Sequence, residues 1–458
     1  MKANKYLIIA INIAALMVLM DLSAINIALP SIRQHFSLSV TIVSFILMAS
    51  MLTATGFALI MGKIIERYRP GKILTIAFLV FGLTSTLTAF SSQFYFIIIL
   101  RLIQGIAEAA LYVIGPALIK KYIEQNKQQK EYGKWMMSCG LGISLGPVIG
   151  GLLIKYFAWN FVFLINAPLA ILGIIYSRNL DKHLSFNKQK SIFDYGGAIY
   201  SFLFLSFLII FFNLISVLGI SNPLLWGTAI LSFVFLSLFI RREKKNEKPI
   251  INLNLFKINN FRLAGLGFYL FFLVNVGSRF LRPFFFEEAR GLSSTTSGLL
   301  MMISPGIMLV VSFFIHYIER YFSTKQLVIT GSILLSISMF MFSFWTTESS
   351  LFFIESSMII LGLAMGVYYP TTTQLGMRSL PNGNHGTGSA IISISKSFGK
   401  LMGVLMFGLL FQLFYDLIIE QEIITISIES KAIQYVFIAA FIVSLINTFI
   451  SFRIKNSE

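Results

Sequence analysis

The chain alternates long apolar runs with short polar connections that contain charged residues, glycine or proline. The apolar runs are about twenty residues long, the length at which an α-helix crosses a hydrocarbon core of about 30 Å. They show no two-residue alternation, which a membrane β-barrel requires. The pattern therefore predicts an all-α membrane protein with fourteen spans, at residues 6–29, 40–61, 73–91, 94–119, 135–156, 159–177, 195–218, 222–240, 262–286, 295–317, 326–346, 350–376, 387–414 and 432–452.

The composition agrees with a chain that lies in lipid. Hydrophobic residues make up 56% and charged residues only 12% of the 458 positions, and the mean hydropathy is +0.81. A soluble domain carries about 25% charged residues, so this chain has too little charge to cover a water-facing surface. The composition thus excludes a soluble globular protein.

The basic residues are distributed unevenly between the two sides of the predicted membrane. A net charge of +17 in a soluble protein would suggest nucleic acid as a partner. Here most of the 36 Lys and Arg residues fall on the side that carries both chain ends. Because basic residues hold loops on the cytoplasmic side, this pattern predicts a cytoplasmic (inner) membrane protein with both termini in the cytoplasm. It also argues against nucleic acid as a partner.

Two connections stand out by their length and polarity. They cover residues 178–194 and 241–262 and bracket the seventh and eighth spans. We therefore predict a six-helix bundle at 1–178, a second at 262–458, and cytoplasmic linkers with an inserted helix pair at 179–261. Two bundles of this kind suggest an internal repeat, which in transporters places the substrate between the halves.

The predicted fourth span contains two charged residues, Arg101 and Glu108. Each costs roughly 2.5–3.5 kcal/mol on insertion scales if it lies at the membrane centre. Seven residues return to the same face of a helix, about 10 Å along its axis, so this face should point to the bundle interior. Either the two residues form internal ion pairs with other helices, or at least one takes part in proton relay or substrate binding.

Two glycine-containing segments are candidates for conformational gating. In the fifth span, small residues four positions apart let helices approach closely, and a proline bends the helix. After the second span, a glycine followed by acidic and basic residues can form a salt-bridge network that latches one conformation. The candidate residues are Gly142, Gly146, Pro147, Gly150 and Gly151 in the fifth span, and Gly62, Glu66 and Arg67 after the second.

Taken together, these motifs resemble the major facilitator superfamily, in particular its fourteen-span drug:proton antiporters. Arg101-x-x-Gln104-Gly105 is similar to the fourth-helix motif that is implicated there in proton transfer. The segment from Gly142 to Gly151 is similar to the fifth-helix motif of antiporters. The first-helix segment from Asp21 to Pro30 and the segment from Trp159 to Pro168 also match the family pattern. The resemblance covers nearly the whole chain and implies the major facilitator fold and proton-driven export.

The chain departs from the family pattern at several charged positions. Glu66 replaces the usual Asp, and Arg69 stands where a glycine is expected, so the latch after the second span can be weaker or rearranged. Glu287 occupies a position that is often Gln, and Glu108 one that is often small. Both add acids that the general pattern does not require.

Proton coupling requires an acid that is charged when the site faces one side of the membrane and neutral when it faces the other. Asp21 lies about 22 Å along the first span and is the first candidate, unless it bonds a neighbouring helix permanently. Glu108 and Glu287 are the second and third candidates, and Arg101 is the basic residue expected to act with them.

Polar side chains inside the predicted spans are candidates for substrate binding. The abundant Phe and Met residues suit an adaptable apolar pocket. Lys396, about a third of the way along its span, either neutralises an acid or binds an anionic substrate, whereas Arg279 and Arg282 can simply extend to the outer headgroups. The candidate substrate-binding residues are Asn26, Gln104, Tyr112, Asn166, Asn275, Tyr369 and Lys396.

The sequence thus predicts a secondary transporter that exports drugs or toxic amphipathic compounds by alternating access. The alternative is an exporter of an endogenous metabolite such as a siderophore, and a remote one is a membrane scaffold or sensor. The four histidines are scattered and no nucleophile constellation or ATP-binding motif is present, so we predict no enzyme, metal or cofactor. The expected partners are a small-molecule substrate, protons and membrane lipid, and the expected functional form is a monomer.

Overall fold

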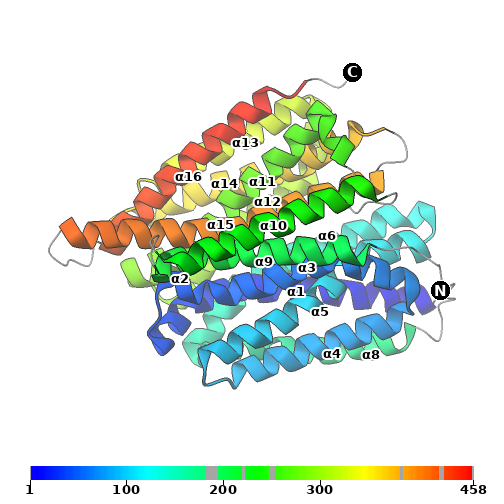
Figure 1. Ribbon diagram of the computed structural model, residues 1–458, viewed down its shortest axis with the longest axis horizontal. Coiled ribbons are helices and arrows are strands. Elements are labelled where there is room, and N and C mark those ends of the chain that lie inside the picture. The colour runs from blue at the N-terminus through cyan, green and yellow to red at the C-terminus, as the bar shows by residue number, and fades with distance from the viewer. Residues whose placement is uncertain are drawn as a thin grey trace. The chain divides into compact units, whose positions relative to one another are not determined.

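The computed structural model describes residues 2–180, 194–218, 222–246, 253–381, 385–421 and 428–455 (Figure 1). Within these residues all regular secondary structure is helical, and there is no β-strand. The helices of the first half are α1 (Lys2–Phe36), α2 (Val40–Val43), α3 (Phe45–Arg67), α4 (Pro70–Ala89), α5 (Phe94–Tyr122), α6 (Gln125–Tyr156), α7 (Phe161–Leu164) and α8 (Asn166–Arg178).

The rest of the described chain continues this pattern. The remaining helices are α9 (Tyr195–Leu218), α10 (Pro223–Lys245), η2 (Leu253–Lys257), α11 (Asn259–Phe284), the π-helical turn η3 (Phe285–Ala289), α12 (Ser294–Ile318), α13 (Thr324–Phe342), α14 (Leu351–Arg378), α15 (His385–Gln421) and α16 (Ile428–Phe452). Among the described residues, thirteen helices are long and apolar enough to cross a membrane, and α9 adds a shorter apolar stretch, Gly196–Phe212. The predicted all-α membrane fold is confirmed.

Helix boundaries differ from the expected spans where hydropathy and helicity diverge. The first span was expected to end at residue 29, but α1 continues through Pro30 to Phe36. The fifth was expected to begin at residue 135, but α6 begins at Gln125 and its first turns are polar. Hydropathy locates only the part of a helix that lies in lipid, whereas backbone hydrogen bonding extends the helix through good helix formers such as Gln, Lys and Glu.

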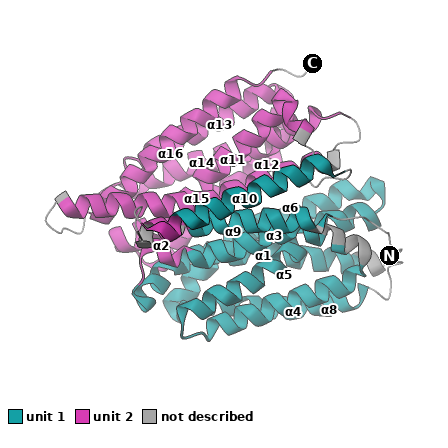
Figure 2. Ribbon diagram, in the orientation of Figure 1, with its two compact units in different colours: residues 1–37, 45–210, 226–250 teal, residues 38–44, 211–225, 251–458 magenta. Residues whose placement is uncertain are grey.

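The helices fall into two compact units, coloured separately in Figure 2. Unit 1 comprises residues 1–37, 45–210 and 226–250, and unit 2 comprises residues 38–44, 211–225 and 251–458. The sequence predicts three parts, divided after residues 178 and 261 at the two long polar connections. That division stays a prediction.

Within unit 1, α1 and α6 are in close backbone contact. A Cβ added at Gly142 would lie 2.7 Å from the carbonyl oxygen of Leu16, and one at Gly146 would lie 2.8 Å from that of Met20. Both glycines and the residues that they face are four positions apart, so the two helices stay in register over successive turns. Ser23 adds a hydrogen bond of 3.0 Å from its Oγ to the carbonyl oxygen of Gly142. The close approach predicted from the small-residue spacing therefore occurs against α1.

Unit 2 contains a comparable close approach between α11 and α15. A Cβ added at Gly403 would lie 2.5 Å from the carbonyl oxygen of Leu273, and one at Gly399 would meet the carbonyl oxygen of Tyr269. Again the glycines and the carbonyls are four residues apart along their helices. The same packing device thus occurs once in each unit.

Candidate functional site

The charged side chains of α1 and α5 meet in the interior of unit 1. Arg101 Nη1 lies 2.8 Å from Asp21 Oδ2, and the exposed fractions of the two side chains are 0% and 1%. In a low-dielectric interior such a pair is stable only when its remaining donors and acceptors are also bonded. The structure therefore confirms that Arg101 points into the bundle, and it identifies Asp21 as the partner.

Arg101 is held by three further groups. Its Nε donates to the carbonyl oxygen of Ile46 over 3.1 Å, and Nη2 donates to Ser50 Oγ over 2.7 Å. Its Nη1 also donates to Gln104 Oε1, one turn along α5, over 3.1 Å. Gly105 permits this arrangement, because a Cβ there would meet the backbone of Ser50 and would push α3 away from α5. The guanidinium fork thus connects α1, α3 and α5.

The second oxygen of Asp21 is bonded from another direction. Asn166, the first residue of α8, donates from Nδ2 to Asp21 Oδ1 over 2.6 Å and also lies 2.9 Å from Ser85 Oγ on α4. Ser85 in turn donates to the carbonyl oxygen of Phe163 over 2.8 Å. Both carboxylate oxygens of Asp21 therefore have a charged or amide donor.

Two polar atoms of this network have no hydrogen-bond partner among the described residues. They are Gln104 Nε2 and Asn166 Oδ1, and both side chains are fully buried. A buried donor and a buried acceptor without partners cost free energy unless a water, proton carrier or ligand reaches them. This polar cluster is the candidate functional site of unit 1.

Glu108 and Tyr112 continue along α5, two and three turns beyond Arg101. Glu108 is 7% exposed, which confirms the predicted inward face of this helix. Tyr112 is 36% exposed, and its ring lies 5.5 Å from that of Trp135 on α6. Both residues lie further along α5 than the bonded groups of the polar cluster, and their predicted roles in proton coupling and substrate binding stay predictions.

Two other candidates lie apart from that cluster. Asn26 is buried, and its Nδ2 donates to the carbonyl oxygen of Leu22 within its own helix over 2.7 Å. Glu287 lies in the π-helical turn η3 of unit 2, with its Oε1 unbonded among the described residues. The roles predicted for Asn26 and Glu287 in substrate binding and proton coupling stay predictions.

The candidates Asn275, Tyr369 and Lys396 come together in unit 2 from α11, α14 and α15. Tyr369 Oη lies 3.5 Å from Asn275 Oδ1, and Lys396 Nζ lies 3.3 Å from Thr373 Oγ1, one turn after Tyr369. No acid pairs with Lys396 among the described residues. Of the two explanations left open by the sequence, neutralisation of an acid therefore has no support from the described part of the chain.

The candidate gating residues are only partly described. Gly142, Gly146 and Gly150 all face α1, and Pro147 lies inside α6 beside the buried Gly151. Gly62, Glu66 and Arg67 belong to the last turns of α3, but their side chains lie outside the described residues. The predicted latch after the second span is therefore untested.

The inserted helices α9 and α10 are joined by an ion pair within unit 1. Asp194 accepts hydrogen bonds from Gly197 N (2.9 Å), Arg242 Nε (2.5 Å) and Asn246 Nδ2 (2.7 Å), and its side chain is 1% exposed. Burial alone would raise the pKa of this carboxyl, but the three donors together hold its pKa below the ordinary value. Asp194 thus caps α9 and binds the end of α10.

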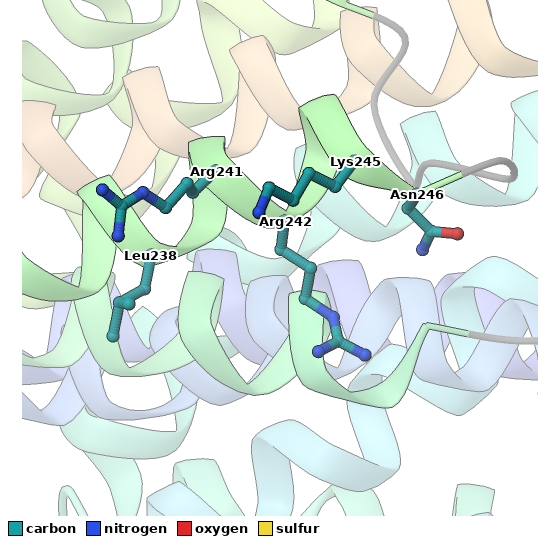
Figure 3. A pocket seen from close by; sticks show the side chains of 5 residues that line it. All are labelled: Leu238, Arg241, Arg242, Lys245 and Asn246. Carbon is teal, nitrogen blue, oxygen red and sulfur yellow. The ribbon is translucent and has the colours of Figure 1, made fainter.

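The end of α10 also borders an open hollow of about 400 Å³ (Figure 3). Arg241 and Lys245 leave the helix one turn apart, while Arg242 points away from them. Leu238 and Asn246 complete the lining. Three basic residues at the end of α10 therefore line this hollow.

Comparison with known proteins decides the family. The model of the Major Facilitator Superfamily matches residues 11–404, which is most of the chain. The chain belongs to this superfamily. It is therefore a multi-pass membrane transporter, and the family predicted from the sequence motifs is confirmed.

Relatives of this chain include transporters and resistance proteins. It is 25% identical to the riboflavin transporter RibZ of Clostridioides difficile (strain 630), over 86% of this chain and 85% of RibZ. It is 24% identical to the methylenomycin A resistance protein of Bacillus subtilis (strain 168), over 86% and 85% of the two chains. Both relatives are named for small organic molecules, riboflavin in one case and methylenomycin A in the other.

A solved structure supports the fold. A bacterial homologue of the human lysosomal transporter Spinster, in an inward-facing and unoccupied conformation, has a TM-score of 0.69 to this chain. The alignment covers 98% of this chain and 96% of the homologue's chain, with 15% sequence identity. The shared property is the major facilitator fold.

Sequence reasoning missed the uncharged members of the polar cluster. Ser50, Ser85 and the carbonyl of Ile46 complete the bonding of Arg101 and Asn166. Hydroxyl groups are frequent in membrane helices and commonly bond the carbonyl one turn earlier in their own helix, so nothing in their spacing distinguishes these two serines.

Proposed function

We propose that this transporter is a proton-coupled antiporter that exports drugs or other toxic amphipathic compounds across the cytoplasmic membrane. The observation that carries the proposal is the buried pair of Asp21 and Arg101. An acid that is removed from water and held by a single guanidinium can change its charge only if its surroundings rearrange. That property is what proton coupling needs.

The proposed coupling step is the protonation of Asp21. The neutral carboxyl no longer compensates Arg101, and an uncompensated buried charge is costly, by about 3–5 kcal/mol when one partner of a buried pair is removed. The cost of the uncompensated charge favours a conformation in which Arg101 reaches another partner or water. Deprotonation on the other side of the membrane restores the pair, so each transport cycle moves a proton inward.

The packing of α1 against α6 supports transmission of this change. Asp21 lies between Met20 and Ser23, which both contact α6 at Gly146 and Gly142. A shift of Asp21 relative to Arg101 is therefore passed directly to α6. In this proposal Gly142, Gly146, Pro147 and Gly150 let α6 follow α1, and Glu108 serves as a second proton carrier further along α5.

A second candidate function is the export of an endogenous metabolite. Unit 2 contains Lys396 without an acidic partner among its described residues, an arrangement unsuited to a purely cationic cargo. The relative RibZ is named for riboflavin transport, which also points to a metabolite. Both candidates use the same proton-coupled cycle. In both, the two chain ends lie in the cytoplasm and the protein works as a monomer.

The experiment uses everted membrane vesicles that contain the wild-type protein or Asp21→Asn. With an imposed proton gradient, the wild type should concentrate an amphipathic dye such as ethidium in the vesicles. Asp21→Asn should lose this concentrative transport while still allowing exchange of dye down its gradient. Asp416→Asn, an exposed acid on α15, is the matched control and should transport like the wild type. Full proton-driven transport by Asp21→Asn would refute the proposed role.

A further inference from the structure

The hollow at the end of α10 is a second polar feature of unit 1, formed by other residues than the cluster around Asp21. Its volume is about 400 Å³, and two of its cations, Arg241 and Lys245, are exposed (Figure 3). Its lining residues, which we call the basic hollow, are Leu238, Arg241, Arg242, Lys245 and Asn246.

One wall of the basic hollow is fixed by Arg242. Its Nε donates to Asp194 Oδ1, and the side chain of Asp194 is 1% exposed. The guanidinium lies directly against the backbone of α9, since a Cβ added at Gly196 would come within 2.5 Å of Arg242 Cζ. Asn246 Nδ2 donates to the other oxygen of Asp194 over 2.7 Å. Asp194 thus holds two of the five lining residues in place.

The other two cations of the basic hollow have no acidic partner in the part of the chain that the structure describes. Arg241 and Lys245 form no ion pair or hydrogen bond with a described residue. The nearby Asp194 is bonded to Arg242 and Asn246 instead, and Glu243 is buried and does not line the hollow. Like charges four residues apart on a helix repel each other. An anion bound between them would remove that repulsion.

The same face of α10 is apolar on the side of these cations that leads into the span. Leu231, Val234 and Leu238 are followed along the helix by Arg241 and Lys245, with steps of three or four residues. Residues with this spacing lie along one side of a helix. Leu231 and Val234 are each 41% exposed. This face therefore presents an apolar strip that ends in two positive charges.

The position of α10 places this strip against lipid. From Pro223 to Ile240 the helix contains no charged residue and rises about 27 Å, close to the hydrocarbon thickness of about 30 Å. The buried share of α10 is 22%, the lowest among the thirteen described spans. Arg241 and Lys245 therefore lie where the hydrocarbon core meets the lipid headgroups.

We propose that the basic hollow is a binding site for one anionic phospholipid. Its phosphate accepts charge-assisted hydrogen bonds from Arg241 and Lys245. One of its acyl chains follows Leu238, Val234 and Leu231 into the hydrocarbon core. A lipid matches this site better than a soluble phosphate, because only a lipid also covers the apolar strip. The inference adds a lipid site to the transporter and does not depend on what the transporter exports.

The test titrates the purified full-length protein in detergent with lipid and counts bound lipids by native mass spectrometry. Dioleoyl phosphatidylglycerol is the anionic probe, and dioleoyl phosphatidylcholine, with the same chains and no net charge, is its matched counterpart. The first phosphatidylglycerol should bind at least tenfold more tightly than the first phosphatidylcholine. Equal affinities for the two lipids would overturn the proposal.

Variants of α10 locate the bound lipid. Arg241→Gln and Lys245→Gln should each weaken binding of the first phosphatidylglycerol about fivefold, the contribution of one cation near a membrane surface. Lys244→Gln removes the same charge from a neighbouring exposed residue that does not line the hollow, so it should bind like the wild type. An equal loss with Lys244→Gln, or unchanged binding by both Arg241→Gln and Lys245→Gln, would reject the site.

A free phosphate offers the same charge as a lipid phosphate, and a second arm separates these two sources. Glycerol 3-phosphate, which has no acyl chain, is added in large molar excess over the bound phosphatidylglycerol. The lipid should stay bound, because the acyl chain contributes contacts that the soluble phosphate lacks. Complete displacement would assign the hollow to a soluble phosphate and overturn the lipid site.

Discussion

Asn166 donates from Nδ2 to Oδ1 of Asp21 across 2.6 Å, although the two residues lie 145 positions apart in the chain. Both side chains are buried. The bond provides a donor for the carboxylate oxygen that Arg101 does not contact. It also connects the start of α8 to the middle of α1. Asp21 is therefore held through both of its carboxylate oxygens.

Removal of this bond should be measurable as a loss of stability. Asn166→Leu removes a hydrogen bond to a charged acceptor and should lower the free energy of unfolding by about 1.5–3 kcal/mol. Asn160→Leu is the comparison, because Asn160 donates to the neutral carbonyl of Ala89 over 3.1 Å. That substitution should cost only about 0.5–1.5 kcal/mol. Denaturant titration of the purified proteins in detergent gives the two values, and an equal loss would contradict the special role of Asn166.

Arg101→Lys tests whether charge or geometry matters at the centre of the cluster. The guanidinium reaches Ile46, Ser50 and Asp21 from three nitrogen atoms, whereas an ammonium group is a single point with three donors. We expect proton-driven transport in vesicles to fall at least tenfold although the positive charge is kept. Arg453→Lys, on an exposed side chain beside Phe449, should leave transport unchanged. Wild-type transport by Arg101→Lys would show that a positive charge alone suffices.

The contact between α1 and α6 predicts that the effect of a glycine-to-alanine substitution on stability depends strongly on its position in α6. Gly146→Ala would place a Cβ against Ser23 and within 2.8 Å of the carbonyl oxygen of Met20. Such overpacking should cost about 1–3 kcal/mol. Gly133→Ala in the same helix meets nothing within 4 Å and is expected to be neutral or slightly stabilising, since alanine favours helix. Thermal unfolding of both variants in detergent should separate them clearly, and equal midpoints would contradict the close approach.

The ion pair between α9 and α10 predicts a pH-dependent stability. Because the pKa of Asp194 is lowered in the folded protein, its contribution is fully present above the ordinary aspartate pKa. The contribution is lost as the pH falls through the lowered value. Asp194→Asn should therefore unfold more easily than the wild type at neutral pH, and the difference should shrink in acid. Unfolding midpoints measured over a pH series check this, and a difference that grows towards low pH would contradict it.

Much of the architecture follows from the sequence alone. Apolar runs of membrane-spanning length determined the helices, and the cost of charge in lipid determined that Arg101 and Glu108 face inward, as they do. Gly142 and Gly146 predicted a close helix contact that the structure places against α1. These properties depend on residues that are near one another in the chain, so they can be read locally.

Only the tertiary structure decided which groups meet. Asp21 bonds Arg101 and Asn166 because α1, α5 and α8 pack in one register, and Ser50 and Ser85 join them from α3 and α4. Likewise, nothing in the chain spacing indicates that Lys396 lies over the ring of Phe268 or that Tyr369 reaches Asn275. Which side chains of two helices meet depends on how each helix is rotated about its axis and shifted along it. The hydropathy of the sequence does not report either quantity. The sequence determined the membrane fold and the buried charges, and packing between distant segments decided their partners.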